Sequence, residues 1–367
     1  MPPDETAPEP VPDTVPDGVP DGASAWTGSD LAATPERWTH HWTDRELADL
    51  FSLTRGIDTT DAGPAPAQLL GPTPDDTATS LTDLADRIRA DLIEGLGFAL
   101  LKGYPVGEID RRTEALGFLM LGRLLGSLRS QNAHGHLLGH VRDVGRDPTD
   151  PTARIYQTND RQTFHTDSVD AVGLLCRTTA KDGGRSLLAS ATTAYRLVVE
   201  RRPDLAPHLF EPIATDRRGE VPDGAEPWFE IPVLSWHDER LTVIYQRTYI
   251  DSAARFERAP RPSAKQIAAL DLWDDILNEP GVAMAMDLEP GDIQFVHNHS
   301  LLHDRTAFVD HTDPERRRHL LRLWVSLSGD RELPPVFAQR YGSVTVGDRG
   351  GITLVDTELC VPLLPPG

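Results

Sequence analysis

The chain has 367 residues, with 36 Lys or Arg against 57 Asp or Glu, and its formal net charge at pH 7 is −21. This acidic balance argues against nucleic acid or an anionic membrane surface as a partner. The length and the 39% hydrophobic content allow a full core in one large domain or two.

The cysteines and the hydropathy pattern indicate the compartment. Cys176 and Cys360 lie far apart in the chain and do not form a disulfide framework. No apolar run approaches the roughly 20 residues of a membrane span. The N-terminus lacks the basic start and apolar stretch of a signal peptide. We therefore expect a cytoplasmic protein with no membrane partner.

The first 30 residues differ in composition from the rest. The stretch MPPDETAPEPVPDTVPDGVPDG holds seven prolines and no basic residue. A segment with so little to bury cannot offset the entropy that ordering costs. We expect residues 1–30 to form a disordered acidic tail and residues 31–367 to form a single domain.

The first part of that domain is expected to be mostly helical. Leucine and isoleucine recur at helical spacing, for example at Leu81, Leu84, Ile88 and Leu92. The segment GFALLKGYPV then has the pattern of a buried strand ended by a turn. These patterns predict helices over 44–56, 79–96 and 110–128, and a strand within 97–106.

From about residue 130 the pattern changes to short apolar runs broken by Gly, Pro and Asp. Two of the runs read as strands are ARIYQT (153–158) and WFEIPVLSWH (228–237). Helices are expected over 192–201 and 263–278. The predicted fold is mainly β with flanking helices (α+β), built around a sandwich or jelly-roll core.

The sequence His165-x-Asp167 is the first chemical signal. In a strand, residues i and i+2 project to the same face, so both side chains can reach one metal ion. Two imidazoles and one carboxylate hold a non-heme Fe(II) on one face and leave the other face open. No further donor of the right kind follows within the segment. The third ligand must come from elsewhere, and the segment HNHSLLHDR offers His297, His299 and His303.

Four ordered segments carry a resemblance to a known family. FHTDSVDAVGLLC, AKDGGRSLLAS, EPGDIQFVHNHSLLHDRTAF and RRRHLLRLWVSL together resemble the TauD/TfdA (taurine dioxygenase-like) family of Fe(II)/2-oxoglutarate-dependent oxygenases. The resemblance spans roughly residues 95–345 and implies a double-stranded β-helix, or jelly-roll, core. It also implies Fe(II), 2-oxoglutarate and O2 as cofactor and co-substrates.

The resemblance assigns the metal and co-substrate residues. It implies that His165, Asp167 and His303 are the catalytic metal ligands, because the family has an Asn five residues before its last histidine and Asn298 stands there. Arg318, 15 residues after His303, matches the arginine that pairs with the far carboxylate of 2-oxoglutarate. Ser186 stands where the family often has a Thr hydroxyl for that carboxylate. A purely structural turn would also explain Ser186.

The primary-substrate residues are less sharply defined. Arg322 matches an arginine that meets an acidic group of the substrate in relatives, although a salt bridge or a second 2-oxoglutarate contact would also explain it. Residues at corresponding places in relatives line the mouth of the site. The resulting candidates in this chain are Tyr156, Gln157, Asn159 and Arg247, with Tyr249 beside them.

The implied reaction is hydroxylation of an unactivated C–H bond of a small, acidic substrate with release of succinate and CO2. Desaturation and ring formation are variants of the same chemistry. Halogenation is disfavoured, because chlorinating relatives carry Gly or Ala in place of Asp167. A metal-dependent hydrolase would need a base such as the Glu of HExxH, and the sequence has no such motif. A catalytically silent jelly-roll binding protein is the other alternative. Relatives form dimers and tetramers, so a homo-oligomer is compatible with the resemblance.

Overall fold

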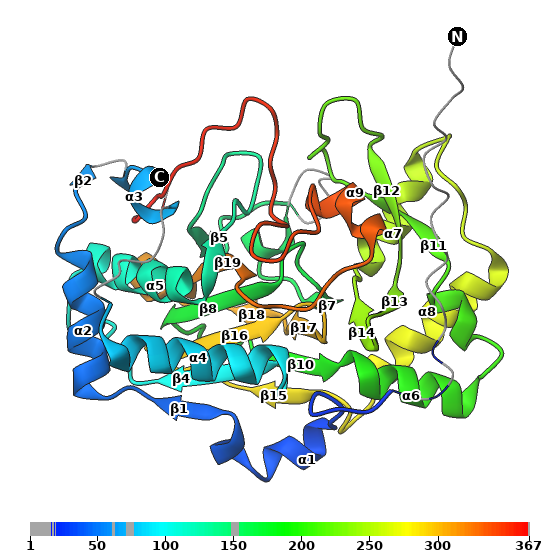
Figure 1. The fold of residues 1–367 in the computed structure, drawn as a ribbon, viewed down its shortest axis with the longest axis horizontal. Coiled ribbons are helices and arrows are strands. Elements are labelled where there is room, and N and C mark those ends of the chain that lie inside the picture. The colour runs from blue at the N-terminus through cyan, green and yellow to red at the C-terminus, as the bar shows by residue number, and fades with distance from the viewer. Residues whose placement is uncertain are drawn as a thin grey trace.

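Two β-sheets that face each other form the centre of the molecule (Figure 1). The computed structural model describes residues 16, 18, 20–60, 63–70, 77–147 and 154–365. The larger sheet has the strand order β1-β4-β16-β8-β19-β5, with β6 also paired to β19. Its strands are β1 (Thr39–His41), β4 (Phe98–Lys102), β5 (Gly126–Leu128), β6 (Gly139–Val141), β8 (Ala171–Thr178), β16 (Ile293–His297) and β19 (His319–Leu327).

The smaller sheet has the order β15-β10-β17-β7, and all its neighbouring pairs are antiparallel. This pair of sheets is the jelly-roll core, and the predicted fold class is confirmed. Further strands form two-stranded ribbons outside the two sheets. The smaller sheet contains β7 (Gln162–His165), β10 (Ser186–Ser190), β15 (Met284–Met286) and β17 (Leu301–Arg305); the ribbons contain β2 (Thr59–Thr60), β3 (Gly63–Pro64), β9 (Asp182–Gly183), β11 (Pro212–Asp216), β12 (Trp228–Pro232), β13 (Leu234–His237), β14 (Arg240–Val243) and β18 (Phe308–Val309).

Side-chain alternation on the strands decides which residues lie between the sheets. On β19, Leu321, Leu323 and Val325 pack outward against the leucines of helices, whereas Trp324 packs inward with residues of the smaller sheet. The helices on this outer face are α2, α4 and α5. The structure's helices are α1 (Gly28–Ala32), α2 (Asp44–Thr54), α3 (Ala67–Leu70), α4 (Thr79–Ile93), α5 (Arg111–Leu125), α6 (Ala191–Arg201), α7 (Arg247–Ser252), α8 (Ala264–Leu277) and α9 (Ala338–Tyr341).

The outer face of the smaller sheet is covered by a different group of elements. Phe164, Ala189 and Leu302 of this sheet pack with α6, α8 and the β13–β14 ribbon, and Trp273 of α8 is fully buried there. Figure 1 shows α6 and α8 together on the right, away from α2 and α5 on the left. The outer face of each sheet is therefore covered by apolar packing, which leaves the interior between the sheets as a protected place for polar groups.

The five predicted helices are confirmed, and four of them are shorter than predicted. The helix expected over 79–96 ends at Ile93, and the one expected over 110–128 ends at Leu125, where β5 begins. The strand expected within 97–106 is β4. Capping boxes fix the starts of α2 at Thr43 and of α8 at Ser263, in agreement with their sequence signals.

Two strand predictions are wrong. The described part of ARIYQT is a 3₁₀ helix over Ile155–Gln157, because the Arg154 amide bonds the Gln157 side chain and the Tyr156 ring packs on the Arg322 guanidinium. The run WFEIPVLSWH is two strands, β12 and β13, which pair with different partners, β11 and β14. Apolar periodicity does not reveal this break.

Most of the predicted N-terminal tail lies outside the described residues, but residues 20–30 lie on the domain. Trp26 is buried, its indole NH donates to the Leu96 carbonyl at 2.8 Å, and its ring contacts Phe98. Arg196 of α6 donates to Pro20 and pairs with Asp21. Some residues before 31 therefore pack against the domain. Within the described ranges, no helix has the length and apolarity of a membrane span.

Trp26 should anchor this segment. Trp26→Ala removes a 5%-exposed side chain from the core between the sheets, and we expect a loss of about 3–5 kcal/mol in the free energy of unfolding. Urea denaturation measures it, with the exposed Val355→Ala as the control. A Trp26→Ala protein as stable as the control would show that residues 20–30 do not stabilise the domain.

Candidate active site

Three potential metal ligands meet between the sheets, at the end of the smaller sheet. His165 ends β7 and His303 lies on β17, and the two residues are direct partners in the antiparallel pairing. Asp167 follows two residues after His165. The ligand atoms of the three side chains all lie within 4.8 Å of one another. His297 and His299, the other histidines of the HNHSLLHDR segment, lie apart in a separate buried cluster with Asp330.

The distances suit a shared cation. The Nε2 atoms of His165 and His303 lie 4.0 Å and 3.9 Å from the two carboxylate oxygens of Asp167. The two imidazole rings have centroids 4.1 Å apart. None of the three residues is more than slightly exposed. One ion at the centre could thus contact two nitrogens and one oxygen and keep its remaining positions for other ligands.

The protonation states also suit a metal. His165 Nδ1 donates to the Thr163 carbonyl at 2.8 Å, which leaves the Nε2 lone pair facing the site, where it accepts from the Gln162 side-chain amide at 2.7 Å. Burial lowers the pKa of His165, and it lowers the pKa of His303 to about 3. Both imidazoles are therefore neutral at neutral pH, which is the form that binds a metal ion.

Asp167 is held as a carboxylate in a fixed direction. Burial alone would raise its pKa, but the Arg322 charge and the two imidazoles outweigh this effect and lower it. The Trp324 indole NH donates to Asp167 Oδ2 at 2.8 Å, and the Asp167 amide donates to the Asn298 side chain at 3.0 Å. Asn298 also donates to the Val169 carbonyl. The Asn that precedes His303 by five residues therefore fixes the loop that carries the carboxylate.

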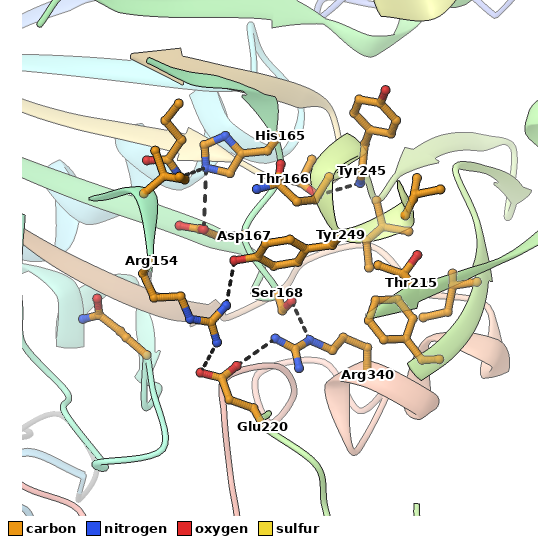
Figure 2. A pocket seen from close by; sticks show the side chains of 18 of the residues that line it. Arg154, His165, Thr166, Asp167, Ser168, Thr215, Glu220, Tyr245, Tyr249 and Arg340 are labelled. Atoms are coloured by element: carbon orange, nitrogen blue, oxygen red, sulfur yellow. Dashed lines mark hydrogen bonds and ion pairs between the residues drawn. The ribbon is translucent and has the colours of Figure 1, made fainter. Parts of the chain in front are cut away.

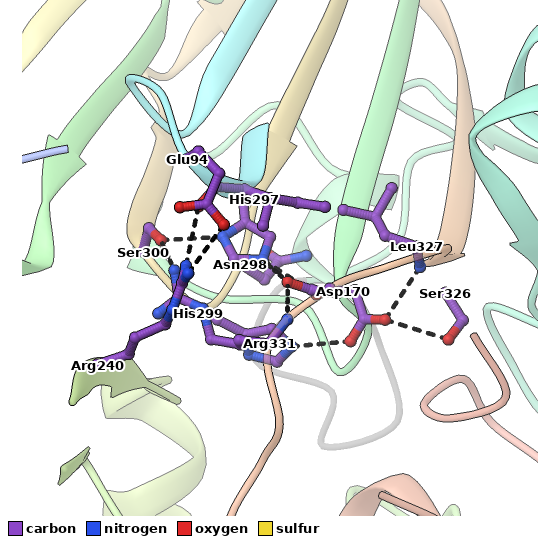
Figure 3. Close-up of polar contacts among 12 residues, drawn as sticks. Glu94, Asp170, Arg240, His297, Asn298, His299, Ser300, Ser326, Leu327 and Arg331 are labelled. Atoms are coloured by element: carbon purple, nitrogen blue, oxygen red, sulfur yellow. Dashed lines mark hydrogen bonds and ion pairs between the residues drawn. The ribbon is translucent and has the colours of Figure 1, made fainter. Parts of the chain in front are cut away.

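A buried ionic network lies behind this loop (Figure 3). Asp170 accepts from Arg349 at 2.7 Å, from His299 at 2.8 Å, and from the Leu327 amide. Arg349 also pairs with Asp330 at 3.0 Å, and all three charged side chains are fully buried. Because Asp170 is three residues from Asp167, the C-terminal segment with Arg349 helps to fix the ligand loop.

One cavity next to the three ligands contains Arg318; we name it the Arg318 cavity. It is lined by His165, Asp167 and His303, by Ser186 and Arg318, and by apolar side chains that include Leu174 and Leu288. Arg318 is buried, and burial lowers its pKa to about 10. Its Nη1 has no hydrogen-bond partner in the described part of the chain. Ser186 Oγ donates to Gln294 Oε1 at 3.0 Å.

A second cavity borders two of the ligands, His165 and Asp167; we name it the Tyr249 cavity (Figure 2). His165, Asp167, Gln162, Tyr156 and Arg322 border both cavities. The residues that line the Tyr249 cavity alone include apolar side chains and a set of charged ones: Ile213, Phe229, Ile231, Ile244, Ile250, Arg154, Glu220 and Arg340.

The predicted substrate residues fall into two groups. Arg322 and Tyr156 border both cavities, with the guanidinium 4.5 Å from the centre of the Tyr156 ring. Asn159 is exposed, and its carbonyl accepts from Phe308. Gln157 caps its own 3₁₀ helix, and neither residue lines a cavity.

Arg247 does not reach the cavities either. It forms ion pairs with Asp251, Asp271 and Asp274, at 3.0, 2.7 and 2.8 Å respectively. Three carboxylates occupy its guanidinium, so α7 and α8 are joined by this residue. Its neighbour Tyr249, two residues along α7, lines the second cavity instead.

Several residues of the site were not singled out from the sequence. Trp324 is one of them, although it lies two residues after Arg322 on the same strand face, and this spacing was a usable signal. Gln162 and Gln131 border the site, and Arg322 Nε donates to Gln131 Oε1 at 2.7 Å. Arg154, Glu220 and Arg340 come from distant segments, and no local pattern marks them.

The fold and the ligand arrangement define the class of the protein: a jelly-roll protein with a two-histidine, one-carboxylate constellation, as in non-heme iron oxygenases. The family model described as "Taurine catabolism dioxygenase TauD, TfdA family" matches residues 62–324. The chain therefore belongs to the TauD/TfdA family, and it is an Fe(II)/2-oxoglutarate-dependent oxygenase. Fe(II), 2-oxoglutarate and O2 are its cofactor and co-substrates.

Individual relatives agree with this assignment. The chain is 33% identical over 247 residues to FR-33289 synthase of Streptomyces rubellomurinus, covering 66% of this chain and 73% of that protein. It is 28% identical over 240 residues to uridine-5'-phosphate dioxygenase of an Amycolatopsis species, covering 63% and 85%. Its fold is similar to asparagine oxygenase with Fe(II), hydroxyasparagine and succinate (TM-score 0.59, 17% identity, 78% and 93% covered). It is also similar to OrfP with Fe and α-ketoglutaric acid (TM-score 0.56, 15% identity, 78% and 92% covered).

The buried network predicts a large cost for removing its central cation. Arg349→Met leaves Asp170 and Asp330 buried without their shared partner, and we expect the free energy of unfolding to fall by about 3–5 kcal/mol. Chemical denaturation measures this loss. Arg202→Met, which removes an exposed arginine that pairs with Asp204, should leave stability unchanged. Equal stability of the two variants would refute a structural role for the network.

Proposed function

We propose that this chain hydroxylates an aliphatic C–H bond of a small acidic molecule, with His165, Asp167 and His303 as the iron ligands. The observation that carries the proposal is that all three donors border one cavity and that two of them, His165 and Asp167, also border a second. One cavity contains a buried arginine, Arg318, whose Nη1 has no hydrogen-bond partner in the described residues. The other leads away from the same ligands toward a mixed apolar and charged wall. A co-substrate and a substrate can therefore reach one metal ion from two sides.

The Arg318 cavity suits 2-oxoglutarate. A buried guanidinium with an unpaired Nη1 favours binding of a carboxylate, because a charge-assisted ion pair offsets the desolvation free energy of the buried charge. The Ser186 hydroxyl borders the same cavity and can donate to that carboxylate in place of Gln294. Leu174 and Leu288 would cover the methylene groups of the bound acid. The opposite, keto-acid end would then lie at the metal.

An acidic group on the primary substrate is supported by Arg322. Its side chain borders both cavities, its Nη1 lies 3.9 Å from Asp167, and its Nε is satisfied by Gln131. The guanidinium thus lies next to the metal ligands, and its ion pair with Asp167 is a long one. A relative at 28% identity, uridine-5'-phosphate dioxygenase, is named for a molecule that carries a phosphate.

Iron(II) held by the three ligands supplies dioxygen activation, coupled to the conversion of 2-oxoglutarate to succinate and CO2. The protein's own residues hold the metal ligands in position. Thr163 and Asn298 hold His165 and Asp167 in position, and Trp324 keeps Asp167 Oδ2 fixed by a hydrogen bond. The Gln162 amide, which now bonds His165 Nε2, has to turn aside when a metal takes that lone pair.

The ligand assignment is tested by metal binding. His303→Ala removes one of three donors, and we expect Fe(II) affinity to fall at least about 100-fold, since outer-shell changes alone cost 10–100-fold. Anaerobic equilibrium dialysis with metal analysis measures this directly, without turnover. The surface variant His208→Ala, whose ring pairs with Glu211, is the control. Unchanged Fe(II) binding in His303→Ala would overturn the assignment.

The co-substrate assignment is tested at Arg318. Arg318→Ala removes a charge-assisted pair worth about 2–4 kcal/mol, so the 2-oxoglutarate concentration for half-maximal succinate release should rise about 30-fold or more. Arg317→Ala is a matched control, because Arg317 is adjacent in sequence but exposed. A similar 2-oxoglutarate requirement in both variants would assign the role to another residue.

A further inference from the structure

Four residues from distant parts of the chain close the end of the Tyr249 cavity. They are Arg154 before the 3₁₀ helix, Glu220 between β11 and β12, Tyr249 on α7 and Arg340 on α9. Figure 2 shows Tyr249 between Asp167 and Arg154, and Glu220 between Arg154 and Arg340. We call these four residues the charged end of the cavity.

The contacts at the charged end form a chain. Arg154 Nη1 donates to the Tyr249 hydroxyl at 2.6 Å, and Arg154 Nη2 pairs with Glu220. Arg340 Nη2 lies 3.3 Å from the other oxygen of Glu220, and Arg340 Nε donates to the Ser168 hydroxyl at 2.8 Å. Ser168 is the residue after Asp167. The charged end is therefore directly joined to the loop that carries a metal ligand.

The charges at this end do not balance. Two guanidinium groups share one carboxylate, and the exposed fractions of the side chains are 17% for Arg154, 7% for Glu220 and 8% for Arg340. Two more cations lie close by: the Arg218 guanidinium is 5.4 Å from the centre of the Tyr249 ring, and Arg340 helps to lower the pKa of Arg217, after burial, to about 10. The three charged cavity residues alone leave one positive charge uncompensated in the described structure.

We infer that the charged end is a binding site for an oxyanion group with one negative charge on the primary substrate. Its donors are the guanidinium groups of Arg154 and Arg340 and the hydroxyls of Tyr249 and Ser168. This rests on the proposed function, since it takes the Tyr249 cavity as the substrate cavity. It adds to Arg322 a second anchor, built from residues that line the Tyr249 cavity and not the Arg318 cavity.

The apolar part of the cavity wall indicates what else the substrate carries. Ile213, Phe229, Ile231 and Ile250 line the same cavity, and none of them offers a side-chain hydrogen bond. A substrate that fits would carry an apolar section as well as the oxyanion group. An anion held by two arginines in a partly buried site is also oriented, because the planar guanidinium groups fix the direction of approach.

A purely structural role is the alternative, in which the arginines and Glu220 only join four segments. The two roles differ in the effect of Glu220. If the site binds an anion, Glu220 competes with the ligand for the arginines, and removing its charge strengthens binding. If the cluster only holds segments together, removing Glu220 loosens the site and weakens binding as the loss of an arginine does.

The experiment uses three probes with one chain length and different end groups: hexanoate, hexanol and hexylamine. Isothermal titration calorimetry on the metal-free, full-length protein measures their affinities, so the readout does not depend on oxidation. We expect hexanoate to bind about tenfold tighter than either other probe, as one charge-assisted contact provides. Equal binding of hexanoate and hexylamine would overturn the inference.

Variants then identify the residues that cause the preference for hexanoate. Arg340→Gln and Arg154→Gln should each weaken hexanoate binding about tenfold, and Glu220→Gln should strengthen it severalfold. Arg258→Gln, an exposed arginine that pairs with Glu226 outside the cavity, should leave it unchanged. Weaker hexanoate binding in Glu220→Gln would support the structural role and refute the inference. If a Gln variant does not fold, Arg340→Lys keeps the charge and should retain hexanoate affinity within a few-fold.

A separate measurement distinguishes this inference from the proposed function. Release of succinate from 2-oxoglutarate with Fe(II), in the absence of any primary substrate, reports on the iron and co-substrate residues alone. Absence of that release in the wild-type protein would contradict the proposed function while leaving the hexanoate affinities interpretable. Normal release together with charge-independent probe binding would contradict only the charged end.

Discussion

The active site depends on one buried negative charge, the carboxylate of Asp167. Burial of a lone carboxylate is costly, so the surrounding structure has to supply positive charge and hydrogen bonds. Arg322 supplies the nearby charge, Trp324 donates to one oxygen, and two imidazoles face the other sides. A divalent cation would complete this compensation. The same groups that stabilise the carboxylate also leave it pointing between two histidines.

The two sheets contribute different residues to the active site. The smaller sheet contributes both histidines as cross-strand partners, so their separation is fixed by strand pairing rather than by a flexible loop. The larger sheet contributes Arg322 and Trp324 from one face of β19, and Arg318 directly precedes that strand. A shift of one sheet against the other would change the distances from these three residues to the two histidines. The fully buried network around Arg349, which joins Asp170 to Asp330, resists such shifts at the point where the ligand loop leaves the sheet.

The sequence predicts those parts of the structure that have a regular period or a matching motif. The motif correctly indicated that Arg318 and Arg322 lie near one another, since both border the Arg318 cavity. The helices were found because their apolar residues recur at the helical period of 3.6 residues. Tyr156 was assigned to a strand and lies on a 3₁₀ helix, because its contact with Arg322 is tertiary and leaves no periodic signal. Arg247 was a reasonable candidate by position, but three carboxylates on α7 and α8 occupy it.

The charged end of the Tyr249 cavity could not be predicted, because its members come from four segments that only the fold brings together. It also explains how an acidic chain can accept an acidic molecule. A net charge of −21 spread over the surface is screened within about 8 Å at physiological ionic strength. Inside a partly buried cavity the screening is weaker, and the nearest side chains dominate the potential. Arg154, Arg322 and Arg340 outnumber Asp167 and Glu220 among the cavity's charged residues, and a bound Fe(II) would add two further positive charges. The interior is therefore attractive to anions although the molecule as a whole repels them, and the site selects by local charge rather than by net charge.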